Sequence, residues 1–401
     1  MHIARQATCS LSCVSKSEAF CSVSRVLIHA LGANMGGAMR HLTNFLPELG
    51  RRDVNREYMV LVRESFPALD VAENIQLERV PDQDCSGWVK RIVSDVFALP
   101  RRLKREKFSG VVSLTNIGPI WSPVPHILFQ RNALFYCPYY LQRIGGRLKV
   151  ETALRRRLAV ASMMRAALIV TPSYAMGAMI REACPQTRSR RFHTLYHGFA
   201  KEALAEPLDE KFVCLLAARK GTRLLYPTHP AQHKGFEVLF DILARLKAEG
   251  LEFCLFTTIS LDDWPAGVSA YKYRLRELGL DDNVVFMGRM PQRQMGALYE
   301  QCDLMVYPSL CESFGFSMIE AMGYGLPIVA ADTAINREIC GAGALYYPPS
   351  DAVAGVKAIR DALEPTVTKK LREGGGARVA AFDWSWRRYT SEFVGILGLV
   401  A

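Results

Sequence analysis

The chain has 401 residues, of which 50% are hydrophobic and 22% charged, a composition typical of a globular protein with two or three domains. No apolar run approaches the roughly 18 residues that a membrane-spanning helix needs. Lys16 and Glu18 interrupt the N-terminal segment, which argues against a secretory signal. The 11 cysteines contain no C-x-x-C pair, which argues against a zinc site or disulfide framework and favours a reducing, cytoplasmic location.

The net charge of +11 is unevenly distributed. Residues 1–200 hold 28 Lys and Arg against 14 Asp and Glu, a balance of +14, whereas residues 201–401 hold 22 against 25, a balance of −3. Two runs, 100–108 and 143–165, concentrate the basic excess. They fit solvated helix faces, or a surface for anionic lipid head groups or phosphate-bearing acceptors. Without a recognised nucleic-acid motif, nucleic acid is not an expected partner.

Residues 1–24 come first, and we expect them to form a disordered tail ahead of a fold that begins near Arg25. From there, short apolar runs rich in β-branched residues recur along the chain. Several are continuously apolar rather than alternating, which is typical of strands buried on both faces of a parallel sheet. The runs are residues 25–31, 58–63, 110–116, 126–132, 167–173, 252–259, 283–289, 303–309 and 326–332.

Helical periodicity lies between many of these strands. Residues 36–50 predict a helix with Gly50 as its C-cap, and residues 235–250 repeat apolar side chains at helical spacing. The alternation of strand and helix predicts two doubly wound α/β domains, with the boundary in the polar segment 199–211. Ligands of such sheets bind beyond the carboxyl ends of the strands, so the loops that follow the strands are the candidates for a site.

The loop after the first strand contains Gly32, Gly36 and Gly37 and leads into a helix. Glycines let a backbone approach a ligand closely, and free N–H groups at a helix start attract a phosphate. The spacing is neither G-x-G-x-x-G nor a P-loop, so an ordinary strand-to-helix turn is the alternative.

A second loop, over residues 226–235, carries His229, His233 and Lys234 between an apolar strand and a helix. A lysine at a helix start adds a mobile positive charge to an anion site. Alone it would be an ordinary surface lysine, but its place at the carboxyl end of a strand favours a diphosphate ligand.

A third loop lies within residues 308–332, which read PSLCESFGFSMIEAMGYGLPIVAAD. Glu312 precedes a predicted helix and Glu320 lies inside it, with the free N–H groups of residues 314–316 between them. Eight residues of helix span roughly 12 Å, comparable to the reach from a sugar ring to a ribose across a diphosphate. Carboxylates only accept hydrogen bonds, so they suit hydroxyl groups. The alternative is two exposed acids on a loop and a helix surface.

Residues 286–332 resemble the signature of the retaining GT-B glycosyltransferases of the "group 1" family, in which a Glu, seven residues and a second Glu follow Pro-Ser. Residues 384–397 resemble the final helix of that family. The resemblance implies an α/β fold of the GT-B type, with two Rossmann-like domains facing a central cleft and a C-terminal helix that crosses back to the first domain. The implied parts are an N-terminal acceptor domain over 25–200, a nucleotide-sugar domain over 201–380, and the crossing helix over 381–401.

The resemblance also assigns roles by position. Glu320 would bind the ribose, Glu312 the donor sugar and Lys234 the diphosphate. The implied catalytic residues are Glu312, Lys234 and Asn132. The implied donor-binding residues are Gly36, Gly37, His233, Lys234, Gly288, Arg289, Glu312, Ser313, Phe314, Gly315, Phe316 and Glu320.

Two positions depart from the family pattern. Many members have an Arg about five residues before the Lys, where this chain offers only His229 or His233 as a replacement. Many also carry a His in the N-terminal domain near the reacting carbon, where this chain has Arg131 and Asn132.

The implied function is a metal-independent, hexosyltransferase-like glycosyltransferase that moves a sugar from a nucleotide-diphosphate sugar to a hydroxyl acceptor and retains its anomeric configuration. The setting would be polysaccharide, lipopolysaccharide or glycolipid synthesis, with no cofactor besides the donor substrate. The expected partners are a glycan or lipid-linked acceptor and, through the basic N-terminal half, the anionic inner face of a membrane.

Other readings of the sequence are weaker. A non-catalytic nucleotide-sugar-binding or scaffolding protein is the alternative from another class, against which the intact Glu pair and Lys234 argue. A metal-dependent transferase would use Asp-x-Asp. Asp82 and Asp84 have that spacing, but their Pro and Ser-Gly neighbours fit a solvated loop. An epimerase would need catalytic acids of its own, and the glycines of residues 341–345 are not placed as a dinucleotide fingerprint after a strand.

Overall fold

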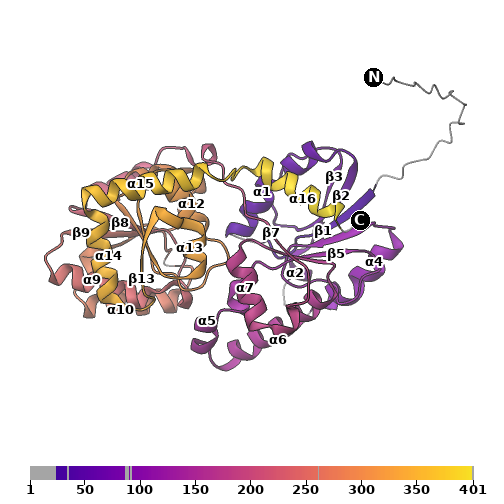
Figure 1. The fold of residues 1–401 in the computed structure, drawn as a ribbon, viewed down its shortest axis with the longest axis horizontal. Coiled ribbons are helices and arrows are strands. Elements are labelled where there is room, and N and C mark those ends of the chain that lie inside the picture. The colour runs from indigo at the N-terminus through magenta and orange to yellow at the C-terminus, as the bar shows by residue number, and fades with distance from the viewer. Residues whose placement is uncertain (1–23, 34–35, 86–89, 91–92, 261, 400–401) are drawn as a thin grey trace, which may run out of the picture.

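The computed structural model describes residues 24–33, 36–85, 90, 93–260 and 262–399. Two α/β domains, each built on a parallel sheet, lie side by side (Figure 1). This confirms the expected two-domain α/β architecture. Of the expected tail 1–24, only Ser24 lies within the described residues, and it begins the first strand.

The first sheet has seven parallel strands in the order β3-β2-β1-β4-β5-β6-β7. The order runs outward from β1 in both directions, which is the doubly wound pattern. Every residue of β5 and β6 is buried, as expected for strands covered by helices on both faces. The strands are β1 (Ser24–His29), β2 (Arg56–Arg63), β3 (Ile75–Val80), β4 (Gly110–Ser113), β5 (His126–Phe129), β6 (Leu168–Thr171) and β7 (Phe192–Thr194).

The helices of the first domain fill the connections between these strands. They are α1 (Gly36–Arg52), α2 (Asp82–Cys85), the π-helix η1 (Ser94–Ala98), α4 (Leu99–Arg105), α5 (Pro138–Arg143), α6 (Gly146–Arg165) and α7 (Tyr174–Ala183), with the short 3-10 helices η2 (Ala133–Phe135) and η3 (Pro185–Thr187).

The predicted C-cap role of Gly50 is wrong, because α1 continues to Arg52. Gly50 instead lies where the helix packs closely on the loop before β3. A Cβ at this position would lie 2.7 Å from the Cβ of Ala72. The glycine is required by this close approach rather than by a helix end.

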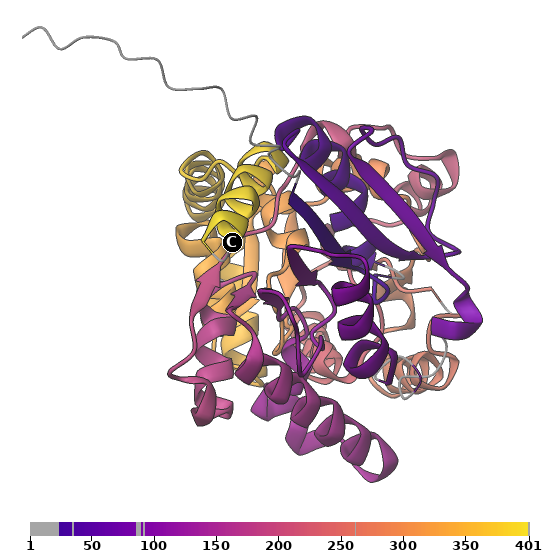
Figure 2. The ribbon, with the colours of Figure 1, turned by 90° about the vertical axis from the view of Figure 1, so that its right-hand side faces the viewer.

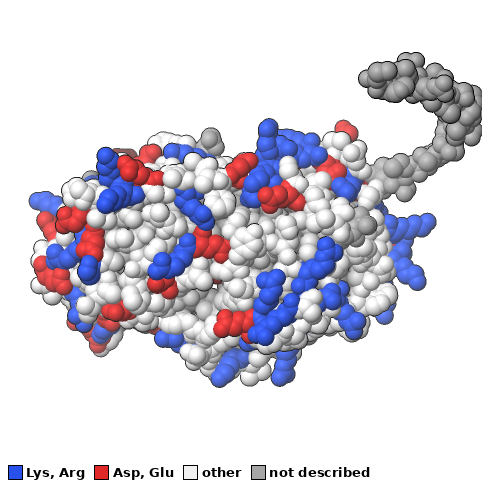
Figure 3. Space-filling view, viewed as in Figure 1, with Lys and Arg blue, Asp and Glu red and all other residues white. Residues whose placement is uncertain are grey.

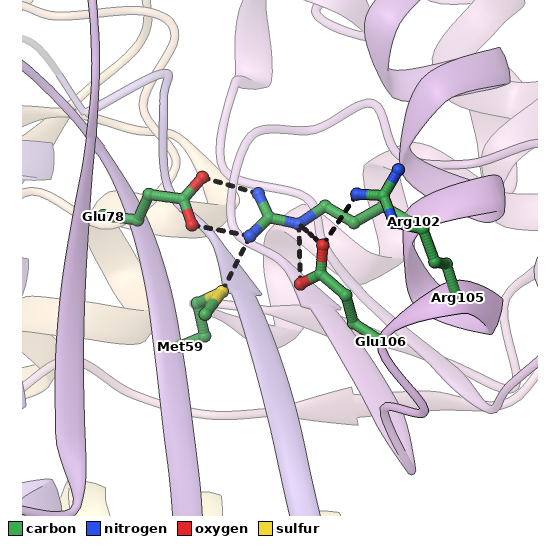
Figure 4. Close-up of polar contacts among 5 residues, drawn as sticks. All are labelled: Met59, Glu78, Arg102, Arg105 and Glu106. Carbon is green, nitrogen blue, oxygen red and sulfur yellow. Dashed lines mark hydrogen bonds and ion pairs between the residues drawn. The ribbon is translucent and has the colours of Figure 1, made fainter.

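Part of the basic run 100–108 holds the fold together rather than facing solvent. Arg102 of α4 donates to both carboxylate oxygens of Glu78 on β3, at 2.6 and 2.5 Å, and to Glu106 at 3.1 Å (Figure 4). The hydrogen bonds to Glu78 raise the pKa of Arg102 further above its ordinary value despite partial burial. Arg102 is therefore not available to an external anion.

The second sheet has six parallel strands in the order β10-β9-β8-β11-β12-β13. The four residues of β11 and the four of β12 are all buried. The strands are β8 (Thr222–Tyr226), β9 (Phe253–Thr257), β10 (Val284–Phe286), β11 (Leu304–Tyr307), β12 (Ile328–Ala331) and β13 (Ala344–Tyr347).

The remaining helices cover the second sheet, except the last. They are α8 (Glu210–Ala217), α9 (Phe236–Ala248), α10 (Pro265–Glu277), α11 (Met295–Glu300), α12 (Phe316–Gly323), α13 (Ala334–Cys340), α14 (Ala352–Leu363), α15 (Pro365–Ala380) and α16 (Trp386–Gly398), with the 3-10 helices η4 (Glu202–Leu204), η5 (Gln232–Lys234), η6 (Asp281–Asn283), η7 (Gln292–Gln294) and η8 (Gly341–Gly343).

Helix α16 returns to the first domain and lies beside α1 (Figures 1 and 2). Tyr389, Phe393 and Ile396 are buried in the core of that domain together with Phe45 of α1. Ser385 begins the helix as its N-cap by accepting a hydrogen bond from the N–H of Arg388 at 3.1 Å. The expected C-terminal crossing helix is confirmed. Within the part of the chain that the structure describes, no helix is both long and apolar enough to cross a bilayer.

Candidate functional site

Glu312 lies in the loop that follows β11, at the carboxyl edge of the second sheet. Its Oε1 atom accepts hydrogen bonds from Lys234 Nζ at 2.6 Å, Ser309 Oγ at 2.6 Å and Tyr307 Oη at 3.0 Å. Burial alone would raise the pKa of this carboxyl, but the ammonium of Lys234 and the hydrogen-bond donors outweigh burial and lower the pKa to about 2. Glu312 is therefore an ionised acceptor at neutral pH.

Lys234 reaches Glu312 because two loops approach closely. Lys234 ends the short helix η5, and Gly235 follows with φ +68°. A Cβ on Gly235 would lie 2.3 Å from the carbonyl oxygen of Pro308, so only glycine fits between this loop and the loop after β11. Lys234 and Glu312, assigned by the family resemblance to the diphosphate and the sugar, are thus brought together as an ion pair.

His229 and His233 lie beside this pair, with ring centroids 6.3 Å apart. Burial, followed by the nearby charge of Lys234, lowers the pKa of both imidazoles, that of His233 to about 4. Both are therefore neutral at neutral pH. Neither provides the permanent positive charge of the Arg that many family members have here, although a neutral imidazole still offers a donor and an acceptor.

Glu320 is the second carboxylate of the predicted pair, and it is only 3% exposed on α12. Its Oε2 atom accepts from Tyr299 Oη at 2.7 Å, and its Oε1 atom accepts from Gln292 Nε2 at 3.3 Å. Arg40 of α1, in the first domain, completes the set as an ion pair with Oε1. The alternative of a solvated helix-surface acid does not hold for Glu320.

The start of α12 lies between the two carboxylates. Gly315, with φ +90°, is followed by Phe316, the first helical residue. Phe314 is buried, and the carbonyl of Ser313 accepts a hydrogen bond from Ser173 of the first domain at 2.9 Å. The expected phosphate-binding backbone therefore lies against the opposite domain.

Gly288 and Arg289 follow β10 at the same edge of the sheet. Gly288 has φ +82°, and a Cβ built there would have no neighbour within 4 Å, so open space adjoins this turn. The side chain of Arg289 is 75% exposed and pairs with Asp263. Arg289 therefore lies on the rim of the site.

On the first-domain side, Gly36 and Gly37 begin α1, and Gly37 faces the start of α12. The ring of Phe316 would lie 3.4 Å from a Cβ on Gly37. Asn132, expected to be catalytic, follows β5 and caps η2, since its side-chain oxygen accepts from the N–H of Leu134 at 3.1 Å. The backbone of Asn132 is also held by the side chain of Asn116 at 2.9 Å.

A buried polar cluster in the first domain was missed from the sequence. The guanidinium of Arg131 lies 3.3 Å from Nδ1 of His41 and 3.3 Å from Nε2 of His197, and Nε2 of His41 lies 2.6 Å from Tyr389 Oη. Because a guanidinium only donates, both imidazoles accept from it and are neutral. Burial, followed by Arg131, lowers the pKa of both histidines.

This cluster borders the site. The ring of His197 stacks on that of Phe316, with centroids 4.9 Å apart. Arg131 makes no ion pair with a carboxylate among the described residues. Its position after β5 was flagged in the sequence as a departure from the family pattern, but its histidine partners lie 90 and 66 residues away and gave no local signal.

Asp82 and Asp84, which have the Asp-x-Asp spacing, lie on the short helix α2 rather than in the expected solvated loop. Asp82 accepts from the backbone N–H of Ser65 at 3.2 Å and from its hydroxyl at 3.1 Å. Within the described ranges, no three His, Cys, Asp or Glu side chains are grouped so that they could hold a metal ion.

Comparison with known proteins now assigns the second domain. Residues 212–375 match the family described as "Glycosyl transferases group 1". The second domain is a glycosyl transferase group 1 domain. Glu312, Glu320 and Lys234 all lie within the matched residues, so the three side chains that the sequence singled out belong to this domain.

A curated relative and two solved structures extend the comparison. The O-antigen chain mannosyltransferase RfbU of Salmonella typhimurium is 34% identical over 85 residues, which cover 21% of this chain and 24% of that protein. The chain thus spans about a quarter of the length of this relative. Sucrose-phosphate synthase from Thermosynechococcus elongatus has a TM-score of 0.71 at 16% identity and covers 94% of this chain and 98% of its own. Anabaena Alr3699/HepE in complex with UDP-glucose has a TM-score of 0.68 at 17% identity, and the match covers 93% of this chain and 99% of that chain. These likenesses cover both domains and show the fold, which is the GT-B arrangement.

Within this glycosyl transferase domain and its partner domain, the structure brings most of the candidate residues to one place. Glu312, Lys234 and His233 form one side, and Glu320 with the start of α12 forms the other, facing Gly37 across the domain boundary. Arg289 is apart on the rim. The carboxylates and basic groups at this place are therefore paired with each other, Glu312 with Lys234 and Glu320 with Arg40.

Proposed function

We propose that this protein is a retaining glycosyltransferase that transfers a sugar from a nucleotide-diphosphate sugar to a hydroxyl acceptor without a metal ion. One observation carries the proposal: two ionisable carboxylates, Glu312 and Glu320, flank the start of α12 next to the ammonium of Lys234. Ribose hydroxyls would donate to Glu320, sugar hydroxyls would donate to Glu312, and the diphosphate would lie between them.

The charge that develops on the leaving nucleoside diphosphate needs positive groups fixed in advance. Lys234 and the N–H groups at the start of α12 supply them in this proposal. The ammonium of Lys234, which now donates to Glu312, would have to donate to the incoming phosphate as well. The two histidines beside Lys234 are neutral and could accept a proton, but they lie on the donor side. The acceptor hydroxyl would therefore lose its proton to the departing phosphate.

The donor site is tested by calorimetry and thermal shift with UDP, GDP, ADP and their common sugar conjugates, each with and without EDTA. We expect one nucleotide family to raise the melting temperature, with no effect of EDTA, and Glu320→Ala to abolish the shift. Proton NMR of the product would then show the same anomeric configuration as in the donor. Binding without any transfer to glycan or lipid-linked acceptors would instead support a non-catalytic nucleotide-sugar-binding protein.

We further propose that helix α6 places the enzyme on the anionic inner face of a membrane, where a lipid-linked glycan would be the acceptor. Its first turns expose Leu148, Val150 and Leu154 to solvent next to the exposed Arg147 and Lys149. Lys and Arg side chains also gather on the face of the first domain that Figure 3 shows. Apolar side chains among basic ones suit a surface with anionic head groups.

Vesicle flotation distinguishes a membrane contact through α6 from attraction by the overall positive charge of the first domain. We expect binding to phosphatidylglycerol vesicles but not to phosphatidylcholine vesicles, and loss of binding in R147E/K149E and in V150D. Arg156 is unsuitable for the test, because its guanidinium holds the carbonyl of Ala183 at the end of α7. Undiminished flotation of both variants would exclude α6 as the contact.

A further inference from the structure

Arg40 connects the two domains at the point where the ribose of a nucleotide is proposed to bind. It extends from α1 across the domain boundary, pairs with the carboxylate of Glu320 on α12, and places its guanidinium carbon 5.0 Å from the centre of the Phe316 ring. Its side chain is 17% exposed and that of Glu320 is 3% exposed. A largely buried ion pair of this kind is only weakly screened by salt.

Glu320 has little capacity for further hydrogen bonds while Arg40 is in place. It already accepts from Tyr299, Gln292 and Arg40, and a carboxylate offers about four acceptor sites in total. The two hydroxyls of a ribose would bring two more donors. At least one present donor has to leave before both hydroxyls can bind.

Arg40 is the one of these three donors that belongs to the opposite domain. Tyr299 and Gln292 belong to the same domain as Glu320; Tyr299 is fully buried, and Gln292 is exposed and makes the longest of the three contacts, at 3.3 Å. Arg40 comes from the opposite domain, and its side chain is 17% exposed. Its guanidinium also lies beside Phe316, where the diphosphate is expected to bind.

We propose that Arg40 is a donor-binding residue that changes its partner when the nucleotide enters. Without nucleotide it pairs with Glu320 and holds the cleft closed at this point. With nucleotide, the ribose hydroxyls take Glu320 and the guanidinium turns to the diphosphate, for which a planar, permanently charged group is well suited. This inference rests on the proposed nucleotide-sugar site.

The binding test compares each nucleoside diphosphate with its nucleoside. Affinities for UDP and uridine, GDP and guanosine, and ADP and adenosine are measured by calorimetry for the wild type, R40M, R40Q and E320Q. We expect both Arg40 variants to bind the nucleoside at least threefold more tightly than the wild type, because the competitor for Glu320 is gone. We expect the advantage of the diphosphate over the nucleoside to fall at least tenfold, because its phosphate partner is gone.

Arg51 provides the matched control, since it lies on the same helix with a 70% exposed side chain, and R51M should bind like the wild type. Parallel weakening of nucleoside and diphosphate in R40M and R40Q would overturn the exchange of partners and leave Arg40 as a support of Glu320.

A second measurement needs no nucleotide. Hydrogen exchange of the amides in residues 36–45 and 316–323 should be faster in ligand-free R40M and R40Q than in the wild type and R51M. Unchanged exchange would overturn the closing role even if nucleotide binds. If the wild-type protein binds no nucleotide, both the proposed function and the change of partner by Arg40 are overturned. The hydrogen-exchange rates would still decide whether Arg40 holds the two domains together.

Discussion

The Nζ atom of Lys234 lies 2.6 Å from the Oε1 atom of Glu312, and the two side chains are only 8% and 14% exposed. They come from loops after different strands, 78 residues apart in the sequence. An ammonium and a carboxylate that are largely removed from water depend on each other, because either alone would be a poorly solvated charge. The ion pair at the candidate site therefore also holds the loop after β8 against the loop after β11.

Lys234→Met should destabilise the protein by about 3 kcal/mol, because it leaves Glu312 without its cation. The double variant K234M/E312Q should regain part of this loss, because the uncompensated charge is removed as well. Urea unfolding of the single and double variants measures both values. Lys357→Met is the control, since its pair with Asp361 is exposed and should change stability by less than about 0.5 kcal/mol. A double variant less stable than K234M would contradict the argument.

Asn132 tests whether a capping residue also takes part in catalysis. Its side chain accepts from the N–H of Leu134, so Asn132→Ala should cost about 1 kcal/mol of stability, whereas Asn132→Asp should keep the cap. Thermal unfolding and transfer rates are compared for the two variants. If Asn132 only caps η2, N132D keeps both stability and rate. A large loss of rate in a fully stable N132D would support the catalytic role that the family resemblance assigned.

The sequence predicted the central strands better than the edge strands, for a physical reason. Strands such as β5 and β11 are buried on both faces, so they appear as continuous apolar runs. Three of the four edge strands, β3, β7 and β13, were not among the predicted runs, whereas the edge strand β10 was; the central strand β8 was expected only as the apolar strand before the second loop. The three missed edge strands are partly exposed, so polar residues interrupt them, as Gln76, Glu78 and Arg79 interrupt β3.

The candidate site shows a similar division. Glu312, Glu320 and Lys234 carry a local signature, because motif spacing and strand ends can be read along the chain. Their partners cannot be read in this way. Arg40 and Glu320 are 280 positions apart in the printed sequence, and Tyr299 reaches Glu320 from a different helix. Such contacts depend on how the two domains are placed, which no local pattern specifies.

Glu338 should couple the two domains. This residue of α13 accepts from the N–H groups of Tyr174 at 2.8 Å and Ala175 at 2.6 Å, at the start of α7, and from Tyr196 Oη at 2.8 Å. Glu338→Ala leaves these donors without their acceptor and should cost about 1–3 kcal/mol. We expect differential scanning calorimetry to show two separated transitions in E338A where the wild type shows one.

The control for this variant is Glu373→Ala on α15, whose side chain is 65% exposed and 3.9 Å from Lys369. It should unfold like the wild type. A single unshifted transition in E338A would mean that other contacts, such as the bond between Ser173 and Ser313, hold the domains together without Glu338.

The buried pair His41 and His197 should make stability depend on pH below neutrality. Burial, followed by Arg131, lowers the pKa of both, and the other groups that face them are Arg40, Arg388 and Tyr389. Well above pH 6.5 both histidines are neutral in the folded and the unfolded chain, so their contribution is complete there. As pH falls below 6.5, the unfolded chain binds protons that the folded chain does not, and stability is lost.

The loss should be roughly 1 kcal/mol per histidine between pH 6.5 and 5.5. Urea unfolding at both pH values measures it in the wild type and in H41Q/H197N. Because His126 is also buried, with its pKa lowered to about 3 by burial and then by His29, the wild type and the double variant share that part of the pH dependence. The difference between their two losses therefore reports His41 and His197 alone, and we expect it to be about 2 kcal/mol. Equal losses would show that the unfolded and folded chains protonate these two side chains alike, which their contacts with the guanidinium of Arg131 argue against.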